Sequence, residues 1–438
     1  MTERPESTVL ANPAAPIAQL GEVISRGQMW AEARALAAQL PPKPHVFNLC
    51  EDRYAFLLTL LAALMRRQVC LLPPSGQAGV LTEILAAYPD AYAASDSPMS
   101  EAGCTLFRVE RPEPAAHAPE PALEPSQTAA IAFTSGSTGG PSPCPHTLDT
   151  FITSAAMALT SLELIERNVM VIATTPAQHM YGLETSIFWP LCSRLIMHRG
   201  RPFFPEDIRR AVAEAPLPAL LVSTPVHLRA LAAAAGPWHN LAGIVSSTAP
   251  LSVELARELE RVTGVEVREI FGSTETLSFA SRRPARESLW RPYRGANLVL
   301  DEAGAAWLRA EHLPSRVALS DRLAIQADGR FQVLGRSADM VKIAGKRLSL
   351  SELNRRLAEI PGVEDGLCYI RESGGCEPRV HAVVVSPLDP GEIRNALRPV
   401  LDPVFLPKRI HYVETLPRQH TGKILKAELD ALLERLEG

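Results

Sequence analysis

The sequence predicts an α/β protein with a large N-terminal domain, residues 1–336, and a small α+β domain, residues 337–438. Short apolar runs of strand length alternate with helical patterns as far as about residue 270, which is the order that a doubly wound sheet produces. After Arg336 the pattern becomes a shorter mixture of helices and strands. With 438 residues and 46% hydrophobic content, the chain can bury a core in each of two or three domains.

The first part of the chain shows helices alternating with strands. Residues 1–16 have no periodicity and are expected to form a loose terminus. Apolar residues at helical spacing predict a helix within Leu20–Leu40. Buried strands are expected at His45–Cys50 and Val69–Leu72, on either side of a helix at Tyr54–Met65.

The middle of the chain continues this alternation after a Pro-, Ala- and Glu-rich linker at residues 111–126. The expected helices are Asp149–Leu162 and Val253–Val262, and the expected strands are Val169–Thr174, Arg194–His198, Ala219–Val222, Gly243–Ser246 and Glu266–Ile270. Polar segments at His179, Ser246–Leu251 and Phe271–Glu275 each follow a strand. Because open α/β sheets bind ligands at the carboxyl ends of their strands, these segments are expected to share one crevice.

The C-terminal part has the pattern of an α+β domain that begins near residues 336–339. Its expected elements are helix Ser351–Ile360, strands Gly366–Ile370 and Val380–Val385, helix Gly391–Leu401, strand Arg409–Val413 and helix Ile424–Leu436. The chain contains no internal repeat.

Composition excludes several classes of function. A net charge of -4 with interspersed charges gives no basic field, so we expect no nucleic-acid partner. The seven cysteines are scattered without a C-x-x-C pair, which argues against a disulfide framework and a zinc site and favours a reducing compartment. The apolar run at Ala55–Met65 is too short to span a bilayer, and the N-terminus has no secretion signal. We therefore expect a cytoplasmic protein.

The most informative stretch is the loop Thr134–Pro141, which follows the apolar run Ala129–Phe133. Its first seven residues contain three glycines and four hydroxyls, so successive backbone N–H groups can converge on an anion. It is not a P-loop, because no Gly-Lys-Ser/Thr closes it. A flexible connector is the alternative interpretation of such a loop.

This loop resembles the phosphate-binding signature of the adenylate-forming superfamily, which includes acyl- and aryl-CoA synthetases, peptide-synthetase adenylation domains and luciferase. Further stretches match that family in the same order: Pro176–Gly182, Phe271–Glu275, Gly335–Arg336 with Lys342–Gly345, and Leu416–Pro417 with Gly422–Ile424. The resemblance implies a large adenylation core at residues 1–336 with partly doubly wound sheets, followed by a small mobile domain at residues 337–438.

The resemblance also implies a nucleotide site for ATP and Mg²⁺. The loop residues that would hold the β and γ phosphates are Thr134, Ser135, Gly136, Ser137, Thr138 and Gly139. Thr274 would contact the α-phosphate, and Glu275 would ligate Mg²⁺ as a hard oxygen donor. Asp321 would accept hydrogen bonds from the ribose hydroxyls, and Arg336 would contact the ribose or a phosphate. The alternatives are a helix start at Thr274-Glu275, a surface Asp321 and a solvated Arg336.

Lys423, His179, Thr274 and Glu275 are the predicted catalytic residues. By resemblance, Lys423 would bridge the substrate carboxylate and the nucleotide during adenylation, and His179 would lie beside the acyl group. A solvated lysine and a hydrogen-bonded loop histidine are the alternatives. The residues that would line the acid and adenine pockets are His179, Met180, Tyr181, Ser246, Ser247, Thr248, Ala249, Pro250, Phe271 and Gly272. Their small and aromatic side chains favour a compact or aryl acid.

A second half-reaction is implied on another edge of the small domain. By resemblance, Lys342 and Gly345 would line a tunnel through which a pantetheine thiol reaches the adenylate. The thiol could belong to CoA or to an acyl carrier protein, whose acidic helix could dock on arginines. The candidate arginines for that docking are Arg282, Arg283, Arg286, Arg291 and Arg294.

The sequence departs from the family pattern in three places. Ser142 stands where the family commonly has the loop lysine, so the phosphate grip could be weaker. Ala338 occupies the hinge position that is usually Asp or Lys. The region before the phosphate loop is shorter than in typical members, which could promote dimer formation, so a monomer or a dimer is expected.

These observations predict an acid–thiol ligase that forms AMP. ATP would activate a small aryl or acyl carboxylic acid as an adenylate, and the acyl group would pass to the pantetheine thiol of a carrier protein. A CoA ligase of aromatic or short-chain acids is the first alternative. A non-catalytic nucleotide-binding descendant is the second, although retention of Lys423, Glu275 and Asp321 favours an active enzyme.

Overall fold

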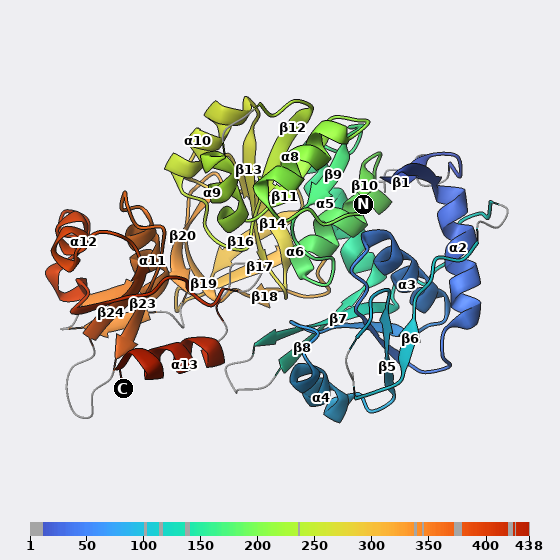
Figure 1. The fold of residues 1–438 in the computed structure, drawn as a ribbon, viewed down its shortest axis with the longest axis horizontal. Helices are drawn as coiled ribbons and strands as arrows, with labels where there is room; N and C mark the ends of the chain where they lie inside the picture. Colours follow the sequence, from blue (N-terminus) through green and yellow to red (C-terminus); the bar gives the residue numbers. More distant parts are fainter. Residues whose placement is uncertain are drawn as a thin grey trace.

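The computed structural model describes residues 12–99, 103–113, 117–135, 141–234, 237–336, 340–343, 346–371, 379–418, 424 and 426–437. These residues form an α/β structure in which two large sheets share one apolar core, and smaller sheets follow toward the C-terminus (Figure 1). The predicted fold class is therefore confirmed.

The larger sheet is mostly parallel. Its strand order is β15 (Arg291–Pro292), β14 (Leu277–Arg282), β13 (Val267–Ser273), β12 (Leu241–Ser246), β11 (Ala219–Ser223), β9 (Met170–Ala173), β10 (Ile196–His198), β1 (Pro16–Leu20) and β2 (Glu22–Ser25). The pairs from β13 to β1 are parallel, whereas β14, β15 and β2 are antiparallel additions at the edges. Helices α8 (Pro205–Glu214), α9 (Pro225–Ala233) and α10 (Val253–Thr263) connect its parallel strands.

The second sheet has the order β6 (Leu106–Arg108), β5 (Ala91–Ser95), β3 (His45–Asn48), β4 (Val69–Leu72), β7 (Thr128–Ser135) and β8 (Pro141–Thr147). Its strands are parallel except for β8, which returns antiparallel to β7. The phosphate-loop motif therefore joins the two strands of a hairpin, with Thr134 and Ser135 inside β7 rather than in the loop. Helix α4 (Ala78–Ala87) connects β4 to β5.

Helix α3 (Arg53–Met65) lies between the two sheets. It contacts β3 and β4 of one sheet and β10 of the other, which explains why its sequence is apolar on all faces. Asp52 begins the helix by accepting hydrogen bonds from the backbone N–H groups of Tyr54 and Ala55. The buried Arg53 guanidinium donates to Ser186 Oγ and to the carbonyls of Ala173 and Thr175, so it ties α3 to the end of β9.

Helix α2 (Arg26–Gln39) begins later than the sequence pattern predicts. Gly21 adopts a positive φ of 79° and joins β1 to β2, and these strands take up the first residues of the predicted helix. Ser25 then caps α2 by accepting a hydrogen bond from the N–H of Gln28. Figure 1 shows α2 and α3 on the same side of the molecule.

Four further helical segments and two small sheets complete the large N-terminal part. Helix α5 (Leu148–Ser161) follows β8, and α6 (Met180–Leu183), a π-helical turn (Glu184–Phe188) and α7 (Trp189–Leu191) follow β9. Strands β16 (Ala296–Leu300), β17 (Ala306–Ala310) and β18 (Val317–Ala318) form one small sheet, and β19 (Asp321–Ile325) and β20 (Phe331–Arg336) form another.

The C-terminal elements follow the predicted α+β order. They are β21 (Met340–Ile343), β22 (Lys346–Ser349), α11 (Leu350–Ala358), β23 (Asp365–Arg371), β24 (Arg379–Val385), α12 (Pro390–Leu397), a 3-10 turn (Pro403–Phe405), β25 (Arg409–Tyr412) and α13 (Lys426–Glu437). Two apolar clusters in this part consist only of residues from Ile343 onward. The predicted domain boundary near residue 336 stays a prediction.

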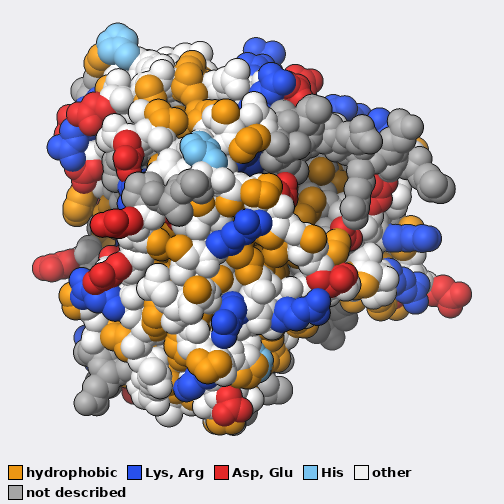
Figure 2. All heavy atoms as spheres, turned by 90° about the vertical axis from the view of Figure 1, so that its right-hand side faces the viewer, with side chains coloured by type: hydrophobic (Ala, Val, Ile, Leu, Met, Phe, Trp, Pro, Cys, Tyr) orange, Lys and Arg blue, Asp and Glu red, His pale blue; other side chains and the backbone are white. Residues whose placement is uncertain are grey.

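The surface facing away from the C-terminal part has no field of one charge. Figure 2 shows Lys, Arg, Asp and Glu side chains scattered among apolar and other polar groups on this face. Among the residues described, no helix combines the length and the hydropathy that a membrane span requires.

Candidate functional site

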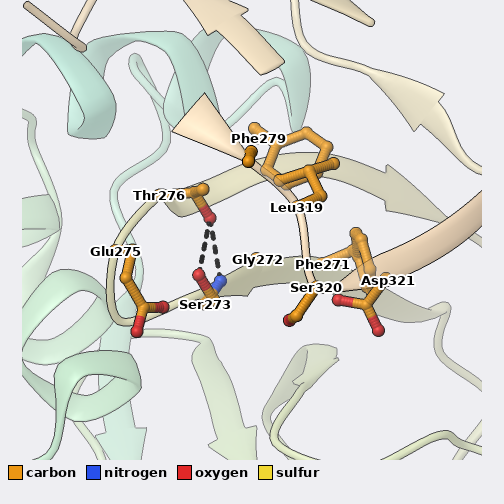
Figure 3. Close-up of a pocket in the computed structure, with 10 residues that line it drawn as sticks. Phe271, Gly272, Ser273, Glu275, Thr276, Phe279, Leu319, Ser320 and Asp321 are labelled. Carbon is orange, nitrogen blue, oxygen red and sulfur yellow. Dashed lines mark hydrogen bonds between the residues drawn. The ribbon is translucent and has the colours of Figure 1, made fainter. Parts of the chain in front are cut away.

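A pocket of about 220 Å³ opens between the β13–β14 hairpin and the connection from β18 to β19. The residues that line it are Phe271, Gly272, Ser273, Glu275, Thr276, Phe279, Ala318, Leu319, Ser320 and Asp321. Figure 3 shows the carboxylates of Glu275 and Asp321 on the same side of the pocket, across from Phe279 and Leu319. Two predicted acidic residues from separate segments thus meet in one pocket that has a polar and an apolar side.

The hairpin turn Thr274–Thr276 presents Glu275 to this pocket. Thr276 Oγ1 accepts a hydrogen bond from the N–H of Ser273 at 2.9 Å and closes the turn (Figure 3). Leu277 at the start of β14 has a φ of 52°. A Cβ atom on Gly272 would lie 1.9 Å from the Leu277 carbonyl oxygen, so only glycine fits there. Thr274 and Glu275 therefore belong to a β-turn, and the alternative of a helix start at these residues is wrong.

Buried side chains hold the same turn from behind. His146 Nε2 lies 2.7 Å from the Thr274 carbonyl oxygen, and His312 Nε2 lies 2.7 Å from the Thr276 carbonyl oxygen. Burial lowers the pKa of both histidines. Just beyond the turn, the N–H of Ser278 donates to Glu184, whose pKa is raised by burial. None of these residues was predicted from the sequence, because their contacts with the turn join distant segments of the chain.

Phe271 connects the pocket to the apolar core. Its ring lies at 5.4 Å from that of Phe279 and at 5.0 Å from that of Trp290, with Phe331 also in contact. Offset and edge-on contacts of this kind hold an aromatic ring in one orientation. The aromatic wall of the pocket is therefore fixed by the core behind it.

Asp321 and Arg336 lie side by side on the two strands of the small β19–β20 sheet. They are register partners at the open end of that hairpin. The sequence separates them, yet the structure brings their backbones together beside the pocket. Their predicted nucleotide contacts stay predictions, and nothing is described of the Arg336 side chain.

The predicted acid-pocket segments lie at the carboxyl ends of β9 and β12. His179 directly precedes α6, and Met180 and Tyr181 are buried. The Tyr181 hydroxyl donates to the carbonyls of Ser223 and Val245, and burial raises the Tyr181 pKa. This side chain therefore fastens α6 to strands β11 and β12.

The Ser246–Leu251 segment is tied to β13. Ser247 Oγ donates to the Ile270 carbonyl at 3.0 Å, and the N–H of Leu251 donates to Glu269 at 2.8 Å. Thr248 adopts a φ of 80°, which residues other than glycine rarely adopt. This segment also contains the predicted pocket residues Ala249 and Pro250.

Several predicted residues lie outside the described part of the chain. They are Gly136, Ser137, Thr138 and Gly139 of the phosphate loop, Gly345 of the thiol tunnel, and Lys423. For Thr134, Ser135 and Lys342 the strands are described, but not the side chains. Residues that line the pocket and were not predicted include Ser273, Thr276, Phe279, Leu319 and Ser320; of these, Ser273, Thr276 and Ser320 adjoin predicted residues.

A divalent cation would have few protein ligands here. The described residues contain no group of three or more His, Cys, Asp or Glu side chains arranged to hold a metal ion. Mg²⁺ commonly takes one or two carboxylates and completes its shell with water and substrate phosphates. The exposed Glu275 carboxylate fits that kind of site.

Comparison with known proteins identifies the family. The AMP-binding enzyme family matches residues 77–303. A 4-coumarate–CoA ligase from Rhodobacter capsulatus is 27% identical over 306 residues, which cover 68% of this chain and 75% of that protein. A 3-hydroxybenzoate–CoA ligase from an Aromatoleum species is 25% identical over 369 residues, covering 74% and 69%.

Solved structures show the same fold. ATP-bound MatB from Rhodopseudomonas palustris superimposes with a TM-score of 0.81 at 19% identity, covering 98% of this chain and 97% of that chain. The o-succinylbenzoate CoA synthetase of Bacillus subtilis, solved with its acyl-adenylate intermediate, gives a TM-score of 0.81 at 16% identity, with 95% of each chain covered. The chain matches the family over more than half its length and belongs to the AMP-binding enzymes of the adenylate-forming superfamily.

Proposed function

We propose that this enzyme activates an aryl carboxylic acid with ATP and transfers the acyl group to the thiol of CoA. The observation that carries the proposal is the convergence of Glu275 and Asp321 on one pocket with an aromatic wall. Support for the acid and the acceptor comes from relatives that are named 4-coumarate–CoA, 3-hydroxybenzoate–CoA and 2-succinylbenzoate–CoA ligases.

The pocket residues fit ATP with Mg²⁺. Phe271 would pack against the adenine, and Asp321 would accept hydrogen bonds from the ribose hydroxyls. Glu275 would hold the metal ion, which supplies positive charge that neutralises the phosphates.

In the first half-reaction an oxygen of the acid forms a bond to the α-phosphorus. The bond from that phosphorus to the bridging oxygen breaks, and pyrophosphate leaves. The chain's contribution is alignment and charge stabilisation, with Thr274 donating to the α-phosphate and Lys423 bridging the reacting oxygens. His179 would lie beside the acyl group. In the second half-reaction the thiol attacks the carbonyl carbon and AMP leaves.

We further propose that residues 1–336 form the adenylation core and residues 337–438 form a domain that rearranges between the half-reactions. Support comes from the C-terminal apolar clusters, which include no residue before Ile343. Lys423 and the Lys342–Gly345 segment would then serve the adenylation and thioester steps in turn.

A carrier protein is the alternative acceptor. Three of the arginines suggested as its docking site form ion pairs within the chain: Arg282 pairs with Glu269, Arg283 with Glu260 and Glu266, and Arg291 with Glu287. These pairs reduce the positive charge that this surface offers to an acidic helix. They favour CoA as the first acceptor to test.

The test is pyrophosphate release with ATP, Mg²⁺ and a panel of aryl and short acyl acids. Each acid is assayed without thiol, with CoA, and with a phosphopantetheinylated carrier protein. Release that depends on one aryl acid and accelerates with CoA would support the proposal. Acceleration by the carrier protein alone would identify a carrier-loading ligase, and ATP binding without release for any acid would favour the non-catalytic alternative.

A further inference from the structure

The turn that presents Glu275 is held through its backbone by two histidines from distant segments. His146 lies in β8, and His312 follows β17. A carbonyl oxygen can only accept a hydrogen bond, so each imidazole must carry its proton on Nε2 and donate it. The two acceptors belong to Thr274 and Thr276, the residues on either side of Glu275.

Helix α5 braces both histidines. The ring of Phe151 lies 5.4 Å from that of His146, and Met157 Sδ lies 3.4 Å from His312 Nδ1. Both imidazoles are almost entirely buried, with exposed fractions of 5% and 3%. Neither ring can leave its carbonyl without opening the packing against α5.

The His146 contact fixes the peptide plane that leads into Glu275, and the His312 contact fixes the plane between Thr276 and Leu277, where the turn ends. Rotation of either plane would break a buried hydrogen bond and leave a carbonyl oxygen unsatisfied, which is unfavourable. Cys144 Sγ, at 3.7 Å from the Thr274 carbonyl oxygen, is a weaker donor to the same acceptor. The direction in which the Glu275 side chain leaves the backbone is thus set from behind the turn.

We propose that His146 and His312 are positioning residues that aim the Glu275 carboxylate at the Mg²⁺ of the bound nucleotide. This inference rests on the proposed function, because it takes Glu275 as the ligand of the metal ion. Neither histidine lines the pocket, so both act only through the turn. Groups that orient a metal ligand typically contribute about 10- to 100-fold to metal affinity.

The test compares amide replacements of different reach. In His146→Gln the side-chain NH₂ can take the place of Nε2, whereas in His146→Asn the NH₂ is one methylene short; His312→Gln and His312→Asn form the second pair. The readout is the affinity for ATP by calorimetry, measured with Mg²⁺ and again with EDTA. A parallel assay measures pyrophosphate release.

The expected result is a loss of the Mg²⁺-dependent part of ATP affinity by roughly 10-fold or more in each Asn variant. Each Gln variant should return to within about threefold of the wild type, and affinity in EDTA should not change in any variant. His381→Leu, which alters a buried histidine in β24, serves as a control that lowers stability without changing the Mg²⁺ dependence.

Equal behaviour of the Asn and Gln variants would overturn the proposal, as would Asn variants that keep the wild-type Mg²⁺ dependence. A wild-type protein that binds ATP equally well with and without Mg²⁺ would also overturn it. Failure of the proposed function looks different. In that case no acid supports pyrophosphate release, yet the Mg²⁺-dependent ATP binding still separates Asn from Gln.

Discussion

The buried pair of Glu269 and Arg282 offers a sharp test of how the hairpin beside the pocket is stabilised. The two residues are register partners on β13 and β14. Arg282 Nη2 lies 2.6 Å from Glu269 Oε2, and the side chain of Glu269 is 3% exposed. Arg282 also stacks on Trp290, with the guanidinium carbon 4.5 Å from the ring centroid. The pair therefore neutralises a carboxylate that has almost no contact with water.

The perturbation is Arg282→Met, which keeps much of the packing on Trp290 and removes the charge. Removing one partner of a buried pair leaves an uncompensated charge and costs about 3–5 kcal/mol. For a cooperative unit the size of the proposed core, residues 1–336, 1 kcal/mol corresponds to about 1.4 °C in Tm, so a decrease of about 4–7 °C is expected. Calorimetry would measure the decrease in Tm, and urea unfolding would measure the decrease in the free energy of unfolding.

The free energy of unfolding that Arg282→Met removes should increase with pH. Burial raises the pKa of Glu269 even with Arg282 opposing that shift, and removal of Arg282 raises it further. A carboxyl group whose pKa is higher in the folded than in the unfolded state binds more protons when folded. Stability therefore falls as pH rises between the two pKa values, so Arg282→Met should be more harmful at pH 8 than at pH 5.

A double-mutant cycle with Glu269→Met provides the control. Because the second change removes the unpaired carboxylate, the double variant should be no less stable than Arg282→Met alone. Additive losses would refute the reasoning, and so would a cost for Arg282→Met below about 1 kcal/mol, the range of an exposed pair.

Four further predictions concern the catalytic steps, the turn and the cysteines. Lys423→Ala should suppress adenylate formation far more than transfer from preformed adenylate, in rapid-quench assays of the separate steps; equal losses would contradict its role. Gly345→Leu should slow mainly thioester formation, and an unchanged thioester rate would rule out the tunnel. Gly272→Ala should abolish pyrophosphate release and lower stability by about 1–3 kcal/mol, because the new Cβ meets the Leu277 carbonyl, whereas Gly243→Ala makes only an ordinary contact at 3.4 Å and should be mild in both assays. Burial raises the pKa of Cys50, Cys70 and Cys368 to about 12, so at pH 8 these thiols should react with iodoacetamide only after denaturation. Mass spectrometry would locate the labels, and labelling of any of these three cysteines in the native protein would contradict the prediction.

Elements with strong periodicity were predicted well from the sequence. Helix α3, strand β4 and the order of the C-terminal elements follow the predicted pattern within a few residues. Strand β5 was missed because its sequence, Ala-Tyr-Ala-Ala-Ser, has little β propensity and is fixed by burial between β3 and β6. The short strands β15 to β19 were missed because pairing with neighbours, rather than local sequence, defines them.

In the site, too, local motifs could be predicted from the sequence, whereas contacts between distant segments could not. Phe271, Glu275 and Asp321 could be placed near one another because their motifs resemble those of the family, and all three line the pocket, whereas their roles stay predictions. The contact of His146 with Thr274 could not be predicted, because it joins residues 128 positions apart and depends on how β8 lies against the hairpin. Periodicity and motif spacing carry no information about such pairs.

The place of α3 between the two sheets has a consequence for synthesis on the ribosome. Its residues end at Met65, but β10, the strand it contacts in the larger sheet, ends at His198. At a translation rate of about 5–20 residues per second, this apolar helix waits roughly 7–27 s before its second partner has been made. During that interval one of its faces is exposed to water and to other chains. Nascent chains stalled between residues 65 and 198 should therefore be a preferred target for chaperones that bind at the ribosome.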